Sequence, residues 1–221
     1  MAYFTPGANV SERASLPPPL AVSTVLFSLS DQILMLPLVR RVRQPFEGKW
    51  ALPGGPVRWN QSLTEVAEQT LISITSEVPR HLEQLYTFGD PGRSPAEHLV
   101  SIVYWAQLGR FAPRPQSNTE WFQATDLPEM AFDHRQIIDY AVQRLRGKPN
   151  LIPGFLEESF TLADLRLAQE AVLGEHLDVA NFRRDVLKSG LVEETGEFYM
   201  GGSHRPAKLY RRVPEIDAQH R

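Results

Sequence analysis

The sequence predicts a mixed α/β domain followed by a small helix-turn-helix domain with a two-stranded β-wing. Runs of β-branched and apolar residues alternate with two helical segments up to residue 148. A stretch rich in proline and glycine follows, and after it come two capped helices and two short strand-like runs. We therefore expect five segments: an extended lead-in at 1–19, the α/β domain at 20–148, a linker at 149–156, the winged helix at 157–213 and a C-terminal tail at 214–221.

The composition limits what the chain does. Of its 221 residues, 42% are hydrophobic and 22% are charged, which is normal for a globular protein with a real core. The chain has no cysteine, which excludes disulfides and thiolate metal sites. Its net charge of −3 means that any surface for nucleic acid is a local patch. No apolar run is long enough to span a membrane and no signal-peptide pattern is present, so we expect a cytoplasmic protein without a membrane partner.

The first domain begins with two apolar runs, 20–29 and 32–41, which predict a β-hairpin. A third short strand ends in the glycine turn of 50–55. Further strands are expected at 85–90, 98–108 and 120–127. Two helices interrupt them: 62–77, with Ser62 and Glu65 as a capping box, and 133–147, capped by Asp133 and stopped by Gly147.

The second domain follows residues 147–155, whose two prolines and two glycines make this stretch the best candidate for a linker. The helix predicted at 160–174 has Thr161 and Asp164 as a capping box and ends at Gly174. The helix at 177–190 has Asp178 as N-cap and ends at Gly190. Two short strand-like runs then flank a loop at 197–206, which completes the winged helix-turn-helix pattern.

The stretch "WALPGG" (50–55) and the helix after it resemble the signature of Nudix hydrolases. Leu71 matches the aliphatic position of that signature. When the signature is aligned on Gly55, its arginine, glutamate and last glycine positions fall on Gln61, Gln69, Thr70, Ser73, Ile74 and Ser76. The resemblance implies a Nudix-like fold, while the residues of the catalytic motif are missing.

The missing carboxylates matter because Nudix enzymes cleave diphosphates with Mg²⁺, a hard cation that needs anionic oxygen ligands. Gln, Thr and Ser are neutral, and Ile cannot bind a metal. Glu65 and Glu68 lie roughly on the other side of the helix, at about 100° per residue, where capping and a solvated face account for them. We therefore predict no catalytic residue, no metal site and no cofactor, and a protein that is not an enzyme.

A pocket for a nucleotide diphosphate remains compatible with the same stretch. Backbone N–H groups at Gly54, Gly55 and the helix N-terminus favour phosphate. Side chains that would add charge or stack on a base are Arg40, Arg41, Arg58, Phe46 and Trp50. For each of these five residues, a surface arginine or a core aromatic is an equally good interpretation.

The predicted second helix of the C-terminal domain has a polar face that suits DNA. Asn181, Arg184 and Lys188 recur on one face, and Arg183 lies between this face and the opposite one. The opposite, apolar face is expected to bury Phe182, Val186 and Leu187. The wing from 198 to 212 contains no acid; its basic residues are Arg205, Lys208, Arg211 and Arg212, interleaved with Tyr199 and Tyr210. A solvated hairpin with a few cations is the alternative interpretation.

Together, the stretches 45–55, 121–148, 160–174, 181–197 and 204–212 resemble the Nudix-related transcriptional regulators of NAD metabolism, the NrtR family. The motifs "AFDH" (131–134), "NFRR" (181–184) and "HRPAKLY" (204–210) are the specific part.

The resemblance implies a homodimeric bacterial repressor that binds a near-palindromic operator upstream of genes for NAD synthesis or salvage. ADP-ribose, the effector, would bind the Nudix-like domain and release the double-stranded DNA. The residues that fall on the family's recognition-helix and wing motifs are Asn181, Phe182, Arg183, Arg184, Arg205, Pro206, Lys208 and Tyr210.

The loop at 90–100 departs from the family pattern. Arg93-Ser94-Pro95 keeps the ends of the loop, but Ala96-Glu97-His98 replaces a basic run. The effector or its affinity therefore stays open, and a regulator of the same architecture that answers another ligand, such as a sugar, is one alternative. The other is a Nudix-type ADP-ribose pyrophosphatase with an atypical metal site.

Overall fold

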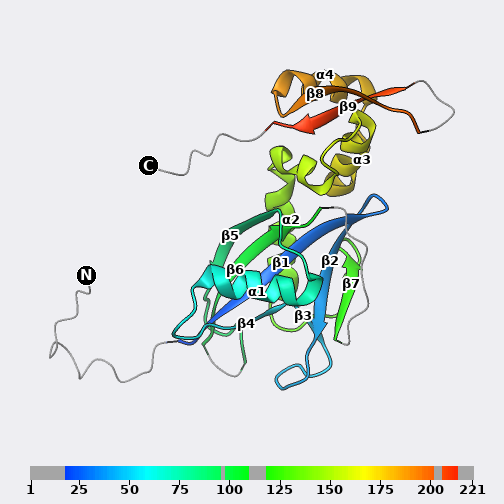
Figure 1. Cartoon of the computed structure of the whole chain (residues 1–221). Helices are drawn as coiled ribbons and strands as arrows, with labels where there is room; N and C mark the ends of the chain where they lie inside the picture. The colour runs from blue at the N-terminus through cyan, green and yellow to red at the C-terminus, as the bar shows by residue number, and fades with distance from the viewer. Residues whose placement is uncertain (1–17, 96–97, 110–117, 202–205, 214–221) are drawn as a thin grey trace.

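The computed structural model describes residues 18–95, 98–109, 118–201 and 206–213. The predicted tail at 214–221, Arg205 and most of the predicted lead-in at 1–19 lie outside these ranges. Within them the chain forms an α/β unit from β1 to α2 and a winged-helix unit from α3 to β9 (Figure 1).

A seven-stranded mixed sheet forms the centre of the N-terminal domain. Its main path runs β3-β2-β1-β6-β5; β4 also pairs with β1, and β7 pairs with β2. β1 and β6 run parallel, and every other pair is antiparallel. The strands are β1 (Leu20–Ser30), β2 (Ile33–Arg40), β3 (Trp50–Ala51), β4 (Gly54–Pro56), β5 (His81–Phe88), β6 (Val100–Gln107) and β7 (Thr119–Gln123). The hairpin and the strands expected from the sequence are present, although β7 is shorter than predicted.

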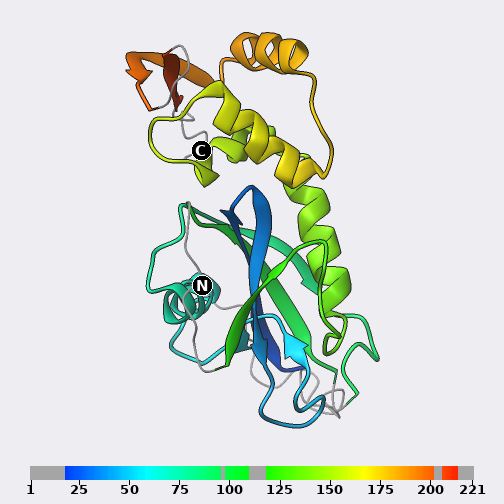
Figure 2. The same ribbon diagram turned by 90° about the vertical axis from the view of Figure 1, so that its right-hand side faces the viewer.

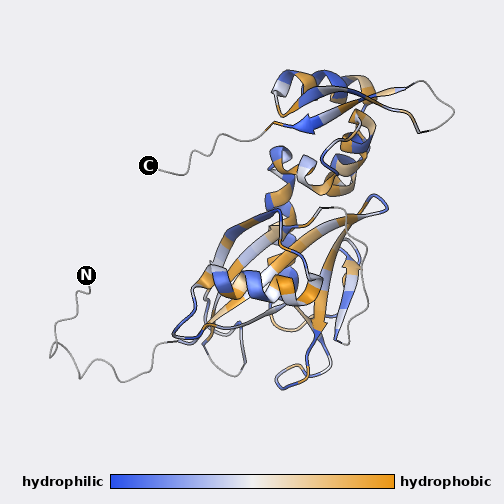
Figure 3. Ribbon diagram, viewed as in Figure 1, coloured by the Kyte–Doolittle hydropathy of each residue, from blue (hydrophilic) through white to orange (hydrophobic). Residues whose placement is uncertain are grey.

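Two helices cover opposite faces of this sheet: α1 (Leu63–Thr75) and α2 (His134–Arg146) (Figures 1 and 2). Alternate residues of β1 supply both layers, because successive side chains of a strand point to opposite faces. Leu26 packs with Leu71 of α1, while Phe27 belongs to the core that contains Ile137 of α2. Apolar residues accordingly follow the central strands, and polar and apolar residues alternate along α1 (Figure 3).

The N-terminus of α1 confirms the predicted capping box. The backbone N–H of Glu65 donates to Ser62 Oγ at 3.1 Å, and the N–H of Ser62 donates to the Glu65 carboxylate at 2.7 Å. The cap predicted for α2 is wrong, because the Asp133 side chain makes no capping hydrogen bond. Its carboxylate binds Arg93 instead, so a buried ion pair takes precedence over the helix cap.

The segment predicted as a linker is a buried 3₁₀ helix, η2 (Pro149–Phe155). Gln107 at the end of β6 donates from Nε2 to the carbonyl of Leu151 at 2.7 Å, and Arg80 donates to the carbonyl of Leu156 at 2.6 Å. A Cβ at Gly154 would lie 2.5 Å from Gln107 Oε1, so this glycine serves close packing rather than flexibility. The predicted linker therefore joins the two domains as a packed helix, with Leu151 to Phe155 buried.

The C-terminal domain has the predicted winged-helix elements: α3 (Leu162–Leu173), α4 (Val179–Ser189), β8 (Val192–Tyr199) and β9 (Ala207–Arg212). The capping box of Thr161 with Asp164 and the Asp178 cap of α4 are confirmed. β8 continues to Tyr199, so residues 197–199 are strand and not loop. A bridge between Phe160 and Tyr210 ties the wing to the segment before α3.

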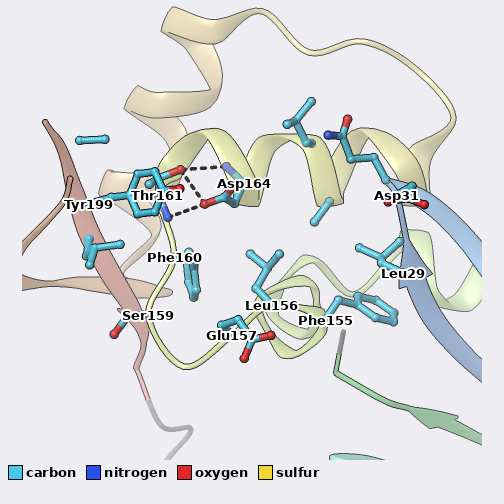
Figure 4. A pocket seen from close by; sticks show the side chains of 15 residues that line it. Leu29, Asp31, Phe155, Leu156, Glu157, Ser159, Phe160, Thr161, Asp164 and Tyr199 are labelled. Carbon is cyan, nitrogen blue, oxygen red and sulfur yellow. Dashed lines mark hydrogen bonds between the residues drawn. The ribbon is translucent and has the colours of Figure 1, made fainter. Parts of the chain in front are cut away.

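The two domains meet around η2 and share one hydrophobic core cluster. A cavity of about 440 Å³ lies at the junction, bordered by Asp31 of the β1–β2 turn, Phe155 of η2, Asp164 of α3 and Tyr199 of the wing (Figure 4). The turn at the tip of the β1–β2 hairpin therefore lies beside the helix-turn-helix. In the ranges described, no helix is long and apolar enough to cross a bilayer.

Candidate ligand pocket and nucleic-acid interface

The helix that should carry the Nudix carboxylates binds its polar side chains back onto itself. Thr70 Oγ1 donates to the Val66 carbonyl and Ser73 Oγ to the Thr70 carbonyl, each at 2.7 Å. Gln61 Nε2 donates to Gln69 Oε1 at 3.0 Å, and Ile74 is only 7% exposed. These positions are neutral, and in the part of the chain that the structure describes no group of three or more His, Asp or Glu residues is arranged to hold a metal ion.

The two nearby acids of α1 have other roles. Hydrogen bonds from the backbone and side chain of Ser62 hold the pKa of Glu65 below its ordinary value, so this carboxylate is committed to the helix cap. Glu68 is exposed on the helix surface. Both positions agree with the structural roles predicted for them.

The glycine turn is built by close backbone contact. Gly54 pairs with Ser23, and a Cβ at Gly54 would lie 2.2 Å from the carbonyl oxygen of Val22. Thr24 fixes the same turn, since its backbone N–H donates to the Pro53 carbonyl at 2.8 Å. Around Gly55, no heavy atom lies within 4 Å of the position that a Cβ would take. Gly54 is therefore required by the fold, while the backbone at Gly55 is open to a ligand.

Three of the residues predicted to bind the effector gather near Phe132, a residue that the sequence analysis did not single out. The Arg41 guanidinium lies 4.7 Å from the centre of the Phe132 ring, and Phe46 meets that ring edge-on at 4.9 Å. Trp50 lies nearby in the chain fold, because its carbonyl accepts from the N–H of Ala131 at 2.7 Å. The signal available in the sequence was the motif "AFDH", to which Phe132 belongs.

The other two predicted cations lie apart from this aromatic group. Arg40 donates from Nε to the Gly48 carbonyl at 3.2 Å. Arg58 is exposed after the glycine turn, and its side chain forms no hydrogen bond or ion pair with the described residues. Arg58 thus remains available to a charged ligand near Gly55.

His134 connects the "AFDH" motif to the glycine turn. Its Nδ1 accepts a hydrogen bond of 2.9 Å from the N–H of Leu52, just before the turn. Burial lowers the pKa of His134 to about 4, so the imidazole is neutral near physiological pH and its proton sits on Nε2. The histidine therefore acts as a fixed acceptor that positions the turn.

Arg93, in the part of the 90–100 loop that keeps the family pattern, is a structural residue. It is 6% exposed and forms a bidentate pair with Asp133, with N–O distances of 2.7 and 2.9 Å. Its Nη1 also donates to Ser101 Oγ at 2.8 Å. The retained end of the loop thus holds α2 to β6; residues 96–97, which carry part of the departure from the family pattern, lie outside the described ranges.

The recognition helix α4 presents cations on its exposed side. Arg183 and Lys188 form no hydrogen bond or ion pair with the described residues, while Arg184 pairs with the adjacent Asp185 at 3.0 Å. Asn181 is exposed near the helix start. The prediction that Leu187 is buried is wrong: it is 43% exposed, because only Phe182 and Val186 of this helix reach the core.

The wing is less free than its sequence suggests, because β8 places acids beside the cations of β9. Glu194 binds Lys208 Nζ at 2.8 Å and raises the pKa of that lysine. Glu193 binds Arg211 at 2.7 Å. Antiparallel pairing brings these acids across from the run of basic residues, a contact that counting charges along 198–212 cannot reveal.

Tyr210 does not reach a DNA surface, contrary to its predicted role. It is 2% exposed and belongs to the same buried cluster as Phe160 and Phe182. Its hydroxyl donates to Glu194 at 3.3 Å, which fixes the partner of Lys208. Pro206 is exposed, and Arg205 lies beyond the described residues.

An α/β domain with a Nudix-type turn, joined to a winged helix with free cations on its recognition helix, defines the class of DNA-binding transcription regulators that carry a Nudix domain. The comparisons name the family. The model of the NrtR DNA-binding winged helix domain matches residues 154–212, and that of the NUDIX domain matches residues 17–141. The chain belongs to the NrtR family of regulators.

Relatives of known function include a regulator and an enzyme. The chain is 33% identical over 213 residues to the ADPR responsive transcriptional repressor NtrR of Acinetobacter baylyi, covering 90% of this chain and 84% of that one. It is also 33% identical over 132 residues to an ADP-ribose pyrophosphatase of Methanocaldococcus jannaschii, covering 58% of this chain and 76% of the enzyme.

Two solved structures of Shewanella oneidensis NrtR are similar to this chain. The complex with a 27mer DNA matches with a TM-score of 0.78 and 36% identity, over 88% of this chain and 93% of that one. Its NUDIX domain complexed with ADP ribose matches with a TM-score of 0.54 and 34% identity, over 62% of this chain and 95% of that one.

Proposed function

We propose that this protein is a cytoplasmic, homodimeric repressor of NAD biosynthesis or salvage genes, released from its operator by ADP-ribose. The observation that carries the proposal is the pairing of a Nudix helix that lacks carboxylates at the metal-binding positions with a C-terminal helix that exposes arginine and lysine side chains. The Acinetobacter repressor responds to ADPR, and the Shewanella structures contain DNA or ADP ribose. A homodimer follows from the two-fold operators that helix-turn-helix proteins bind.

For the effector site we propose the region between the glycine turn and Phe132. The open backbone at Gly55 and the N-terminus of α1 suit a diphosphate, and Arg58 supplies a free positive charge. The Phe46 and Phe132 rings beside Arg41 suit a base or a ribose. Trp50 borders this region through the hydrogen bond of its carbonyl with the N–H of Ala131, whereas Arg40 lies apart from it and stays a prediction.

Release of DNA requires that ADP-ribose bind the DNA-incompetent arrangement more tightly than the DNA-competent one. We expect the DNA-competent and DNA-incompetent arrangements to differ at the junction around η2. There the β1–β2 turn of the sensor domain lies beside α3, which supports the recognition helix. A small shift of the turn would therefore reach the helix-turn-helix directly.

A gel shift with the DNA upstream of the genes beside its own tests the proposal, with and without ADP-ribose. A sequence-specific shift that ADP-ribose reverses is the expected result. Absence of any specific shift would rule out DNA-binding regulation. A specific shift indifferent to ADP-ribose would rule out only the effector.

A second candidate is hydrolysis of ADP-ribose, which the similarity to the archaeal pyrophosphatase favours. We propose instead that the Nudix domain is catalytically inactive, because the helix α1 offers neutral side chains where Mg²⁺ needs carboxylates. Incubation of concentrated protein with ADP-ribose and Mg²⁺ or Mn²⁺ tests this directly. We expect no AMP, and steady turnover would establish the enzyme.

A regulator that answers a different ligand is the third candidate, favoured by the altered loop at 90–100. A thermal-shift screen distinguishes it, since a ligand of the folded state raises the melting temperature. We expect the largest rise with ADP-ribose among nucleotides and sugars. A larger rise with a sugar would transfer the proposal to that ligand.

A further inference from the structure

The helix α4 exposes two large aliphatic side chains on a surface that is otherwise polar apart from the methyl group of Ala180. Val179 is 63% exposed and Leu187 is 43% exposed. Val179 is the first residue of the helix, directly after the Asp178 cap. A β-branched residue adds little to helix stability, so neither burial nor helix propensity accounts for valine at this position.

Val179 borders a cleft of about 520 Å³ between α3, α4 and the wing. Arg183 and Lys208 line the same cleft, and Arg183 follows Val179 by one helical turn. At about 100° per residue the two side chains are separated by roughly 40° around the helix, so they lie on the same edge. An aliphatic group and an exposed guanidinium, which interacts with Glu194 through charge alone, thus lie together on the wing side of the helix.

The major groove of DNA presents one apolar feature to such a side chain. Residues at the start of a recognition helix reach the base edges, and these edges carry donors and acceptors except for the C5 methyl group of thymine. The valine side chain has no donor or acceptor, and the Arg183 guanidinium beside it, which forms no ion pair with the described residues, favours contact with DNA rather than with an apolar protein surface.

We infer that Val179 reads the 5-methyl group of a thymine in each operator half-site. The inference rests on the proposed function, since it assigns one base contact within the proposed DNA complex. Covering one methyl group by an aliphatic side chain changes affinity about fourfold. Val179 is therefore a specificity residue, whereas the cations beside it bind DNA of any sequence more evenly.

The test uses a duplex selected from a random-sequence library by repeated binding to the full-length protein. Each thymine is replaced in turn by deoxyuridine, which lacks only the 5-methyl group. We expect one thymine in each half-site at which this replacement weakens binding about fourfold. In the Val179→Ser variant the penalty at that position disappears, while penalties at other positions stay.

The matched control is Val78→Ser, which removes another exposed valine, 73% exposed, from the loop after α1. It should keep the full uracil penalty. If Val179→Ser lowers the affinity for every duplex alike and keeps the penalty, the side chain packs against Phe198 across the cleft and the inference is overturned. A wild-type protein without any uracil penalty also overturns it, and this result needs no folded variant.

Failure of the wild-type protein to select any duplex is a different outcome, because it contradicts the proposed function itself. Should Val179→Ser fail to fold by circular dichroism, Val179→Ala serves in its place. Alanine keeps a single methyl carbon, so the uracil penalty should shrink without vanishing. An unchanged penalty in the alanine variant counts against the inference.

Discussion

Helices α1 and α4 begin and end in the same way but carry different side chains on their exposed faces. Both begin with a side-chain cap and end at a residue in the left-handed conformation, Ser76 after α1 and Gly190 after α4. The polar side chains of α1 at the signature positions bond to their own helix or to a neighbouring glutamine, whereas Arg183 and Lys188 of α4 form no hydrogen bond or ion pair with the described residues.

The caps and the apolar stripe are therefore sufficient to form each helix, whatever side chains occupy its exposed positions. In α1 the stripe of Val66, Leu71 and Ile74 holds the helix on the sheet, and neutral side chains occupy the positions where the Nudix signature has carboxylates. In α4 only two residues are buried, and the rest of the surface is free to meet a partner. A sensor domain and a DNA-binding domain can therefore share local construction and differ in charge.

The largest expected effect comes from adding a charge to each helix. Ile74→Glu places a carboxylate at a buried position of α1 and should lower the free energy of unfolding by about 3–5 kcal/mol. Leu187→Glu on α4 should change it by less than about 0.5 kcal/mol, because that position is exposed. Urea unfolding of both variants measures the contrast, and equal losses would contradict the assigned burial.

The second effect is the pH dependence of stability that the buried His134 of the α/β domain introduces. The folded-state pKa of His134 is lowered to about 4 by burial, below its unfolded value of 6.5. The unfolded chain therefore binds the proton first, and stability present above pH 6.5 falls as the pH drops towards 4, by about 3 kcal/mol.

Unfolding measured across this pH range in His134→Gln should show a flatter loss of stability than in the wild type. A wild-type slope in His134→Gln would contradict the neutral, buried imidazole.

The third effect separates DNA binding from ADP-ribose binding. Arg183→Ala should weaken operator binding about tenfold and reduce the salt slope by about one, as the loss of one phosphate contact does. Arg58→Ala removes an exposed arginine from the Nudix domain. It should leave the affinity for DNA unchanged and lower the affinity for ADP-ribose. Anisotropy titrations at several salt concentrations give the operator affinity and its salt slope. Equal effects of the two variants would contradict the assignment of DNA binding to one domain and ADP-ribose binding to the other.

The smallest effect tests the ion pairs of the wing. Glu194→Gln releases Lys208, so DNA affinity should rise by about twofold to fivefold and the salt slope should increase. Glu68→Gln removes an exposed acid from α1 and should have no effect on DNA binding. A drop in affinity for Glu194→Gln would instead indicate that the pair with Lys208 positions the wing.

Much of this fold could be predicted from local sequence signals. Capping boxes at Ser62 and Thr161 and the terminal glycines Gly174 and Gly190 located three helices, because these signals act within a few residues. Long-range contacts could not be predicted in this way. The Asp133 carboxylate binds Arg93 rather than capping α2, and packing by Gln107 turns a proline- and glycine-rich stretch into a buried helix.

The candidate sites also contain residues that local sequence signals predict and residues that only long-range contacts bring together. Residue type and helical spacing were enough to find the cations of α4. They missed Phe132 and His134, which become part of a site only when the chain returns to the glycine turn. Tyr210 falls on the wing motif of the family, which predicts contact with DNA, but strand alternation and the pairing with Phe160 place its side chain inside the domain.

The central claim is that the Nudix domain senses ADP-ribose without destroying it. The most direct test mixes the full-length protein, its selected operator duplex, Mg²⁺ and ADP-ribose, and follows DNA release and nucleotide products in the same sample. We expect the duplex to be released while ADP-ribose stays intact. Conversion of ADP-ribose to AMP, or a protein that holds the duplex at saturating ADP-ribose, would contradict it.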